Sequence, residues 1–170
     1  MALSHKRLVL ASVLAALTCA ATLVITVPSP TGGFMNLGDT IVLVSAYLLG
    51  PWWGAAAAGI GSAMADLIAG YAVYIPATLV IKGLMALCAA FLYRFLRKKR
   101  WAVLPCGVLA ETIMVLGYWG YDGILMKSFS GAASGIPANL TQAAFGLAAS
   151  SALTLALRSS SYIRKEFTHI

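Results

Sequence analysis

The chain has 170 residues, of which 61% are hydrophobic and only 10% are charged, and its net charge is +7. A soluble domain usually has about 25% charged residues, so a protein this apolar lacks the polar groups needed to cover a surface in water. Each membrane crossing takes roughly 20 residues, which leaves no room for a separate catalytic or nucleotide-binding domain. We therefore expect one membrane domain over residues 1–170.

Six apolar runs separated by turn residues predict six transmembrane helices. The first run stops at Pro28 and Pro30, and the second stops at Gly50-Pro51; proline and glycine in such positions end helices. A turn at 71–76 follows the third run, and a Gly- and Ser-rich connection at 120–137 follows the fifth. The predicted helices cover residues 8–27, 40–49, 53–69, 77–96, 101–119 and 138–157. The expected fold class is an all-α integral membrane bundle.

The basic residues indicate how this bundle is oriented. With the N-terminus in the cytoplasm, ten of the twelve Lys and Arg residues fall in the N-terminal segment, the 94–100 cluster or the C-terminal tail. Lys127 is the single basic residue in the predicted outer segments. Cytoplasmic loops of membrane proteins carry an excess of Lys and Arg. We therefore expect six crossings with both termini cytoplasmic, and no nucleic-acid partner for the basic cluster, which lies in a short turn.

Ionisable residues within the predicted helices are candidates for function, because such groups are costly at membrane depth. Asp66, Lys82 and Glu111 lie in the third, fourth and fifth helices. Asp66 and Lys82 could pair with each other across adjacent helices or contact a ligand, and the sequence leaves both possibilities open. Glu111 has no cationic neighbour in its own helix, which favours a functional role.

Polar and aromatic side chains also gather towards the predicted outer ends of the helices. Amide, hydroxyl and aromatic groups together suit a small polar heteroaromatic ligand. Two of these residues have a structural alternative, since Asn139 could be a helix N-cap and Tyr118 part of an interfacial aromatic belt. The candidate binding residues are Asn36, Tyr74, Lys82, Glu111, Tyr118, Asn139 and Gln142, with Glu111 as the floor.

Small residues recur at a spacing of four in the first helix, in two adjacent stripes. Ala11, Ala15 and Cys19 form one stripe, and the second is made by Ser12, Ala16 and Ala20. Such stripes let helices approach closely. They serve either packing within the bundle or docking on another membrane protein.

The segment from Gly33 to Gly83 resembles the substrate-binding S components of energy-coupling factor (ECF) transporters, in the branch that takes up riboflavin, hydroxymethylpyrimidine and vitamin B6. The similar elements are Asn-Leu-Gly-Asp at 36–39, Leu-Gly-Pro at 49–51, Asp-Leu-Ile-Ala-Gly at 66–70 and the segment 76–83. The resemblance implies a multi-pass protein of the bacterial cell membrane that binds a vitamin near the outer surface. Hydroxymethylpyrimidine or pyridoxine is favoured, because the candidate pocket has no evident cluster of cations, and riboflavin is the alternative.

The resemblance also implies roles for particular segments and partners. The loop from Pro28 to Asp39 acts as a lid, with Phe34, Met35, Asn36 and Asp39 as its lid residues. The Ala11 and Ala15 face of the first helix docks on a transmembrane coupling subunit, and two cytoplasmic ATPase subunits power uptake. The chain itself has no GxxxxGK[ST] phosphate loop, so ATP hydrolysis is expected on those partners.

Two other classes of function are alternatives to a binding subunit. A self-sufficient ion-coupled transporter could use Asp66 and Glu111 as coupling carboxylates. An intramembrane enzyme is disfavoured, because the sequence has no HExxH motif and its two histidines, His5 and His169, lie at the termini. Cysteine spacing gives no metal site, and we expect no metal and no cofactor.

Overall fold

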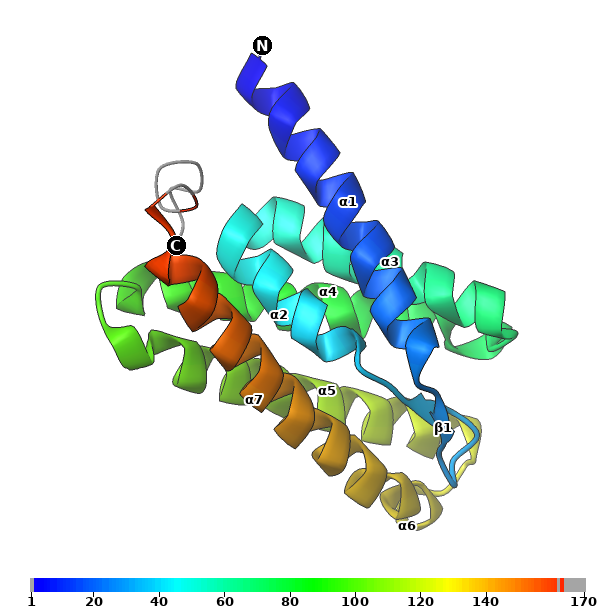
Figure 1. The fold of residues 1–170 in the computed structure, drawn as a ribbon. Coiled ribbons are helices and arrows are strands. Elements are labelled where there is room, and N and C mark those ends of the chain that lie inside the picture. The colour runs from blue at the N-terminus through cyan, green and yellow to red at the C-terminus, as the bar shows by residue number, and fades with distance from the viewer. Residues whose placement is uncertain (1, 162, 164–170) are drawn as a thin grey trace.

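The computed structural model describes residues 2–161 and 163, and it is almost entirely helical (Figure 1). Arg164 and Lys165, which the sequence analysis counts among the cytoplasmic cations, lie outside the described residues. Short 3-10 turns occur at 72–74, 100–102 and 133–135. The elements are α1 (Ala2–Val24), β1 (Val27–Pro28), β2 (Phe34–Met35), α2 (Gly38–Leu49), α3 (Pro51–Ala69), α4 (Ile75–Leu96), α5 (Val103–Leu125), α6 (Phe129–Ala132) and α7 (Ile136–Ser159).

Several helix ends differ from the sequence prediction, and two of them do so for a local reason. The first helix ends at Val24 rather than 27, because Val27–Pro28 pairs antiparallel with Phe34–Met35 to form a small hairpin. The fifth helix runs to Leu125 rather than 119, and the predicted connection after it contains α6. Its extension is held by side-chain hydrogen bonds, including one from Trp119 Nε1 to the Phe129 carbonyl at 3.1 Å.

The short helix α2 forms the centre of the bundle. Ten of its twelve residues are buried, and it packs against α1, α3, α4 and α7 (Figure 1). A helix that is apolar on all sides is stable only when other helices surround it. This central position brings Asp39, in the first turn of α2, between the long helices.

Glycines in α3 allow two neighbouring helices, α1 and α2, to approach it closely. A Cβ atom at Gly54 would lie 2.9 Å from the Ala46 Cα of α2, and one at Gly61 would lie 2.4 Å from the Ala15 carbonyl oxygen of α1. Close backbone approach through small residues is the usual way that membrane helices pack. The Gly- and Ala-rich composition of α3 is therefore a packing feature.

Four of the described helical segments are long and apolar enough to cross a membrane, namely His5–Val24, Ala72–Leu96, Val103–Leu125 and Phe129–Ser159. That is two fewer than the six predicted crossings. The twelve residues of α2 span only about 18 Å at 1.5 Å per residue, and α3 is not among the four segments. Many large hydrophobic side chains on the outside of the bundle are exposed, as expected for a surface in lipid.

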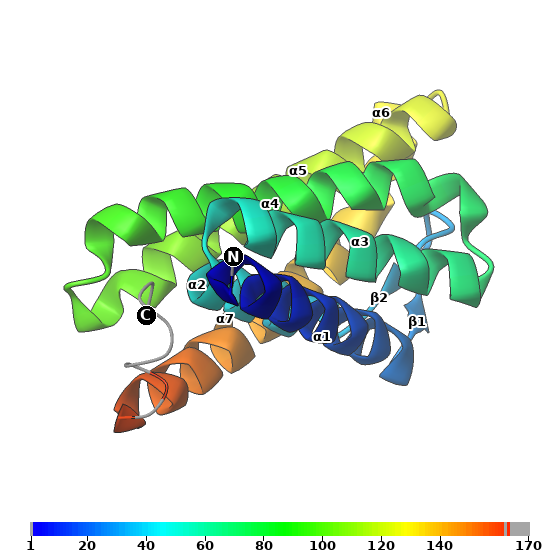
Figure 2. The ribbon, with the colours of Figure 1, turned by 90° about the horizontal axis from the view of Figure 1, so that it is seen from above.

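The two ends of the bundle differ in character. The β hairpin, the 72–74 turn and α6 lie at one end, whereas the α2–α3 turn, the 97–102 turn and the last residues of α7 lie at the other (Figures 1 and 2). Basic side chains cluster at this second end. Arg158 of α7 donates hydrogen bonds to the backbone carbonyls of Arg97 and Lys99, which ties the end of α7 to the α4–α5 turn.

Candidate ligand-binding cavity

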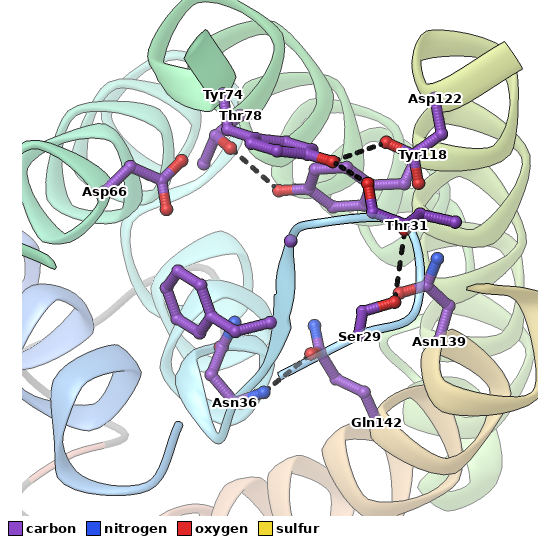
Figure 3. Close-up of a pocket in the computed structure, with 12 residues that line it drawn as sticks. Ser29, Thr31, Asn36, Asp66, Tyr74, Thr78, Tyr118, Asp122, Asn139 and Gln142 are labelled. Carbon is purple, nitrogen blue, oxygen red and sulfur yellow. Dashed lines mark hydrogen bonds between the residues drawn. The ribbon is translucent and has the colours of Figure 1, made fainter. Parts of the chain in front are cut away.

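A cavity opens at the hairpin end of the bundle (Figure 3). Hydroxyl, amide, carboxyl and aromatic groups from the hairpin and from four of the long helices face it. The lining residues are Ser29, Thr31, Gly33, Phe34, Asn36, Asp66, Tyr74, Thr78, Tyr118, Asp122, Asn139 and Gln142.

The structure brings five of the seven sequence-predicted binding residues to this cavity. Those five are Asn36, Tyr74, Tyr118, Asn139 and Gln142. The other two, Lys82 and Glu111, are buried and are not among the lining residues.

The four predicted lid residues do not share one location. Phe34 and Asn36 line the main cavity, and the Phe34 ring lies 4.7 Å from the ring of Tyr71 between centroids. Met35 lines a second, largely apolar cavity, which is also bordered by Ile25 and Phe145. Asp39 is 1% exposed and lies in the interior.

Lys82 forms a buried ion pair with Asp39. The sequence analysis left open a pair between Lys82 and Asp66; the ammonium group pairs with Asp39 instead, because the central helix α2 places that carboxylate beside α4. The second carboxylate oxygen of Asp39 accepts a hydrogen bond of 2.6 Å from Gln142 Nε2. One acidic side chain therefore joins α2, α4 and α7.

Glu111 borders this buried polar cluster. Its side chain is 4% exposed, and neither carboxyl oxygen has a hydrogen-bond partner among the described residues. A Cβ atom at Gly146 would lie 2.5 Å from Glu111 Oε1 and 2.8 Å from the Asp39 Cβ. The absence of a side chain at Gly146 thus lets α7 lie directly against both acidic residues.

The hairpin is held over the cavity by hydrogen bonds to helices distant in sequence. The Asn36 backbone N–H donates to Gln142 Oε1 at 2.8 Å. The Tyr74 hydroxyl lies 3.1 Å from the Thr31 carbonyl and 2.9 Å from Asp122 Oδ1. A tyrosine hydroxyl has one proton to donate, so Thr31 and Asp122 compete for it. The closed hairpin is therefore held by few and exchangeable contacts.

Tyr118 connects the cavity with the buried cluster below it. Its hydroxyl is hydrogen-bonded to the Thr78 hydroxyl at 3.0 Å, and the Lys82 ammonium lies 5.5 Å from the centroid of its ring. Cations are attracted to the face of an aromatic ring. The Tyr118 ring thus separates the ammonium group from the cavity.

Sequence reasoning did not select several residues that line the cavity. Ser29 and Thr31 lie in the predicted lid, but a loop sequence does not reveal which hydroxyls point inward. Thr78 shares a helix face with Tyr74 and Lys82, because the three residues are spaced four apart. This spacing could have identified Thr78 as a lining residue. Asp122 was visible as a polar residue after the predicted fifth helix, and the extension of α5 brings it to Tyr74.

Replacing Gln142 with leucine is expected to loosen the hairpin. The change leaves the Asn36 N–H and one oxygen of Asp39 without a partner, at a cost of about 1–3 kcal/mol. In hydrogen exchange on the membrane-embedded protein, the Asn36 amide should exchange at least about tenfold faster. The control is Thr141→Val, which removes the exposed neighbouring hydroxyl bonded to the Pro137 carbonyl. Equal exchange in both variants would show that Gln142 does not hold the hairpin.

The small residues of α1 divide between an inner and an outer face. Ala11 is 6% exposed and packs with Val44 and Leu48 of α2, and Ala15 is partly buried beside the same cluster. The predicted docking pair therefore packs largely within the bundle, because the glycines of α3 draw α1 close. Ser12, Ala16 and Ala20 of the second stripe are exposed.

Comparison with known proteins gives three results. A family model described as the S component of the ECF-type riboflavin transporter matches residues 2–159. A solved structure of the S component of a bacterial ECF transporter superposes with a TM-score of 0.67 over 92% of this chain and 97% of that one, at 18% identity, so this likeness concerns the fold. A protein of Pyrococcus woesei, described as an uncharacterized protein in a gap 3′ region, is 37% identical over 98 residues.

The match to the Pyrococcus protein covers 57% of this chain and 65% of that relative, just under two thirds of its length. The family model, in contrast, spans almost the whole chain. The resemblance carried by the segment from Gly33 to Gly83 is thereby confirmed. The chain belongs to the family of ECF-type riboflavin transporter S components, the substrate-binding membrane subunits of ECF transporters.

Proposed function

We propose that this chain captures a small heteroaromatic vitamin or vitamin precursor in the hairpin-covered cavity and delivers it for ATP-driven uptake. Hydroxymethylpyrimidine and pyridoxine are the favoured ligands. Riboflavin, which the description of the family model names, is the alternative. The observation that carries the proposal is the lining of the cavity, which combines aromatic rings with hydrogen-bonding groups under a closable loop.

The charges around the cavity support a ligand without phosphate. The described residues that line the cavity include no Lys or Arg. Two of the lining residues, Asp66 and Asp122, are acidic. Lys82 is engaged with Asp39 below the cavity. A buried phosphate without a cationic partner would be strongly disfavoured. The rings of Phe34, Tyr74 and Tyr118 offer stacking surfaces for a flat ligand.

The charge distribution also supports an orientation with the cavity outside. Basic residues cluster at the end of the bundle opposite the hairpin, and cytoplasmic segments carry the excess of such residues. The proposal therefore keeps six crossings and two cytoplasmic termini in the bacterial cell membrane. In it α2 and α3 count as crossings although neither is among the four long apolar segments, because neighbouring helices bury much of α2 and about half of the residues of α3.

The partners in this proposal are a transmembrane coupling subunit and two cytoplasmic ATPases. The outer face of α1 is the docking surface for the coupling subunit. Its exposed small residues, Ser12, Ala16 and Ala20, allow close approach by another helix. This assignment moves the docking contact by one position from Ala11 and Ala15, which pack with an apolar cluster inside the bundle.

Mass spectrometry of the small molecules released from the denatured, freshly purified protein tests the proposal. One of the three candidates is expected in the released fraction. In titrations with the purified chain, the same compound should bind at micromolar or tighter concentration. Its phosphate ester should bind at least about 100-fold more weakly, because two lining carboxylates would face the phosphate. If no vitamin or precursor of this kind binds, the proposal is wrong.

A pair of matched threonine variants locates the binding site. Thr78→Val removes a hydroxyl that lines the cavity and bonds Tyr118, and affinity should fall about fivefold to tenfold, as expected for loss of about 1 kcal/mol. Thr112→Val makes the same change on the exposed side of α5, where the hydroxyl bonds the Val108 carbonyl. Affinity in this control should stay within about twofold of the original. Equal losses in both variants would place the ligand elsewhere.

A further inference from the structure

One carboxyl oxygen of Asp66, Oδ2, has an unused hydrogen-bonding capacity, and the residue lines the cavity. It lies on α3, its side chain is 4% exposed, and its carboxyl group is directed towards the space between Thr78 and Asn36 (Figure 3). Among the residues that the structure describes, none donates a hydrogen bond to Asp66 Oδ2. A buried carboxyl oxygen without a donor is costly, so a ligand that supplies a donor gains binding energy here.

The other acidic residues near the cavity already have partners or lie away from it. Asp39 pairs with Lys82 and accepts a hydrogen bond from Gln142. Asp122 accepts one from the Tyr74 hydroxyl. Glu111 also has free oxygens, but it is not among the residues that line the cavity. Of the two lining carboxyl groups, that of Asp66 is therefore the one with an oxygen available to accept a hydrogen bond from the ligand.

We propose that Asp66 selects ligands by accepting hydrogen bonds from an exocyclic amine and from a protonated ring nitrogen next to it. A carboxylate has two acceptor oxygens in one plane, and such a donor pair matches them in a bidentate, charge-assisted contact. The proposal rests on the function proposed above and narrows its substrate class to amino-substituted pyrimidine-type rings. Within the three candidates, this class is represented by hydroxymethylpyrimidine.

The same chemistry disfavours the other two candidates. The ring edge of riboflavin presents one N–H between two carbonyl oxygens, and these acceptors would face the acceptor oxygens of Asp66. Pyridoxine has hydroxyl donors but no adjacent amine and ring N–H pair. A site with a buried polar group rejects analogues that leave this group unpaired. Asp66 thus acts as a specificity-determining residue.

The first test uses the unaltered chain in lipid nanodiscs and four ligands. Hydroxymethylpyrimidine is compared with its deaminated analogue, in which a ring carbonyl replaces the exocyclic amine, and with pyridoxine and riboflavin. We expect the amino form to bind about 100-fold or more tightly than the oxo analogue, the upper range for a hydrogen bond to a charged group. An amino-to-oxo affinity ratio below about fivefold overturns the inference, whether or not any variant can be purified.

The second test compares two identical substitutions in the same cavity. Asp66→Asn should reduce the amino-to-oxo affinity ratio to below about fivefold, because an amide offers one acceptor oxygen and a donor in place of the second. Asp122→Asn, the matched variant, should leave this ratio near the original value even where it weakens both ligands. An unchanged ratio in Asp66→Asn overturns the inference.

The outcomes separate this inference from the function on which it rests. If pyridoxine or riboflavin binds more tightly than the aminopyrimidine, Asp66 does not select the ligand, although the chain is still a vitamin-binding subunit. If none of the three vitamins or precursors binds, the proposed function itself fails. A preference for the amino form that disappears in Asp66→Asn supports both the proposed function and the selective role of Asp66.

Discussion

Replacing Lys82 with methionine is expected to destabilise the protein by about 3–5 kcal/mol, the usual cost of removing one partner of a buried ion pair. The Lys82 side chain is 2% exposed and its ammonium group pairs with Asp39, which is 1% exposed. Glu111 borders the same cluster without a hydrogen-bond partner among the described residues. The variant therefore leaves two buried acidic groups without a cation. The measurement is the temperature at which half of the detergent-solubilised protein is lost from the monodisperse fraction.

Two further variants make this prediction specific. Asp39→Asn combined with Lys82→Met removes both charges of the pair, and it should recover at least half of the lost stability, because replacing both partners of a buried pair is often nearly neutral. Lys127→Met, on the exposed connection after α5, should have little effect, since exposed charges contribute little. If the single variant at Lys82 is as stable as the original, the ion pair is not a structural element of the bundle.

Gly61→Ala is the second substitution with a large expected effect. The added Cβ would lie 2.4 Å from the Ala15 carbonyl oxygen and 2.9 Å from the Thr18 Cβ, both on α1. The contact with backbone cannot be relieved by a side-chain rotation, so α1 must move away from α3. Overpacking of this kind costs about 1–3 kcal/mol. It would also disturb the start of the hairpin, which follows α1 directly.

Gly120→Ala is the matched control for this steric effect. Gly120 also lies within a long helix, but a Cβ there would have nothing within 4 Å. Alanine is favoured over glycine inside helices by roughly 0.5–1 kcal/mol, so the control should be neutral or slightly stabilised in the same thermal assay. Equal behaviour of the two variants would mean that the close approach of α1 and α3 contributes nothing to stability.

The segmental organisation of this protein is largely readable from the sequence. Runs of apolar residues bounded by Gly50-Pro51 and by prolines such as Pro28 indicate where helices lie, because hydropathy and the conformational limits of Gly and Pro act locally. The Asn-Leu-Gly-Asp segment at 36–39 carries the family resemblance. Helix ends are less readable, as Trp119 shows: α5 continues past it to Leu125, since the next turn finds hydrogen-bond partners on distant elements.

The candidate site is readable only in part. Tyr74, Tyr118 and Asn139 could be selected because they are polar or aromatic residues near predicted helix ends. Thr31 could not, because nothing in a loop sequence says which side chains turn inward. Asp66 was recognised as an unusual buried acid, but its role depended on whether Lys82 neutralises it. That question is decided by distances between helices, which a single sequence does not contain.

The sequence by itself determined that this is a helical membrane protein, where most of its helices lie, and that basic residues concentrate in alternate connecting segments. Only the tertiary structure decided that Lys82 pairs with Asp39 rather than Asp66, and that Ala11 faces the interior of the bundle. The physical reason is the distance along the chain over which each effect acts. Apolar runs and turn residues act over a few neighbouring positions, whereas the partner of a buried charge and the inner face of a helix depend on how all the helices pack around α2.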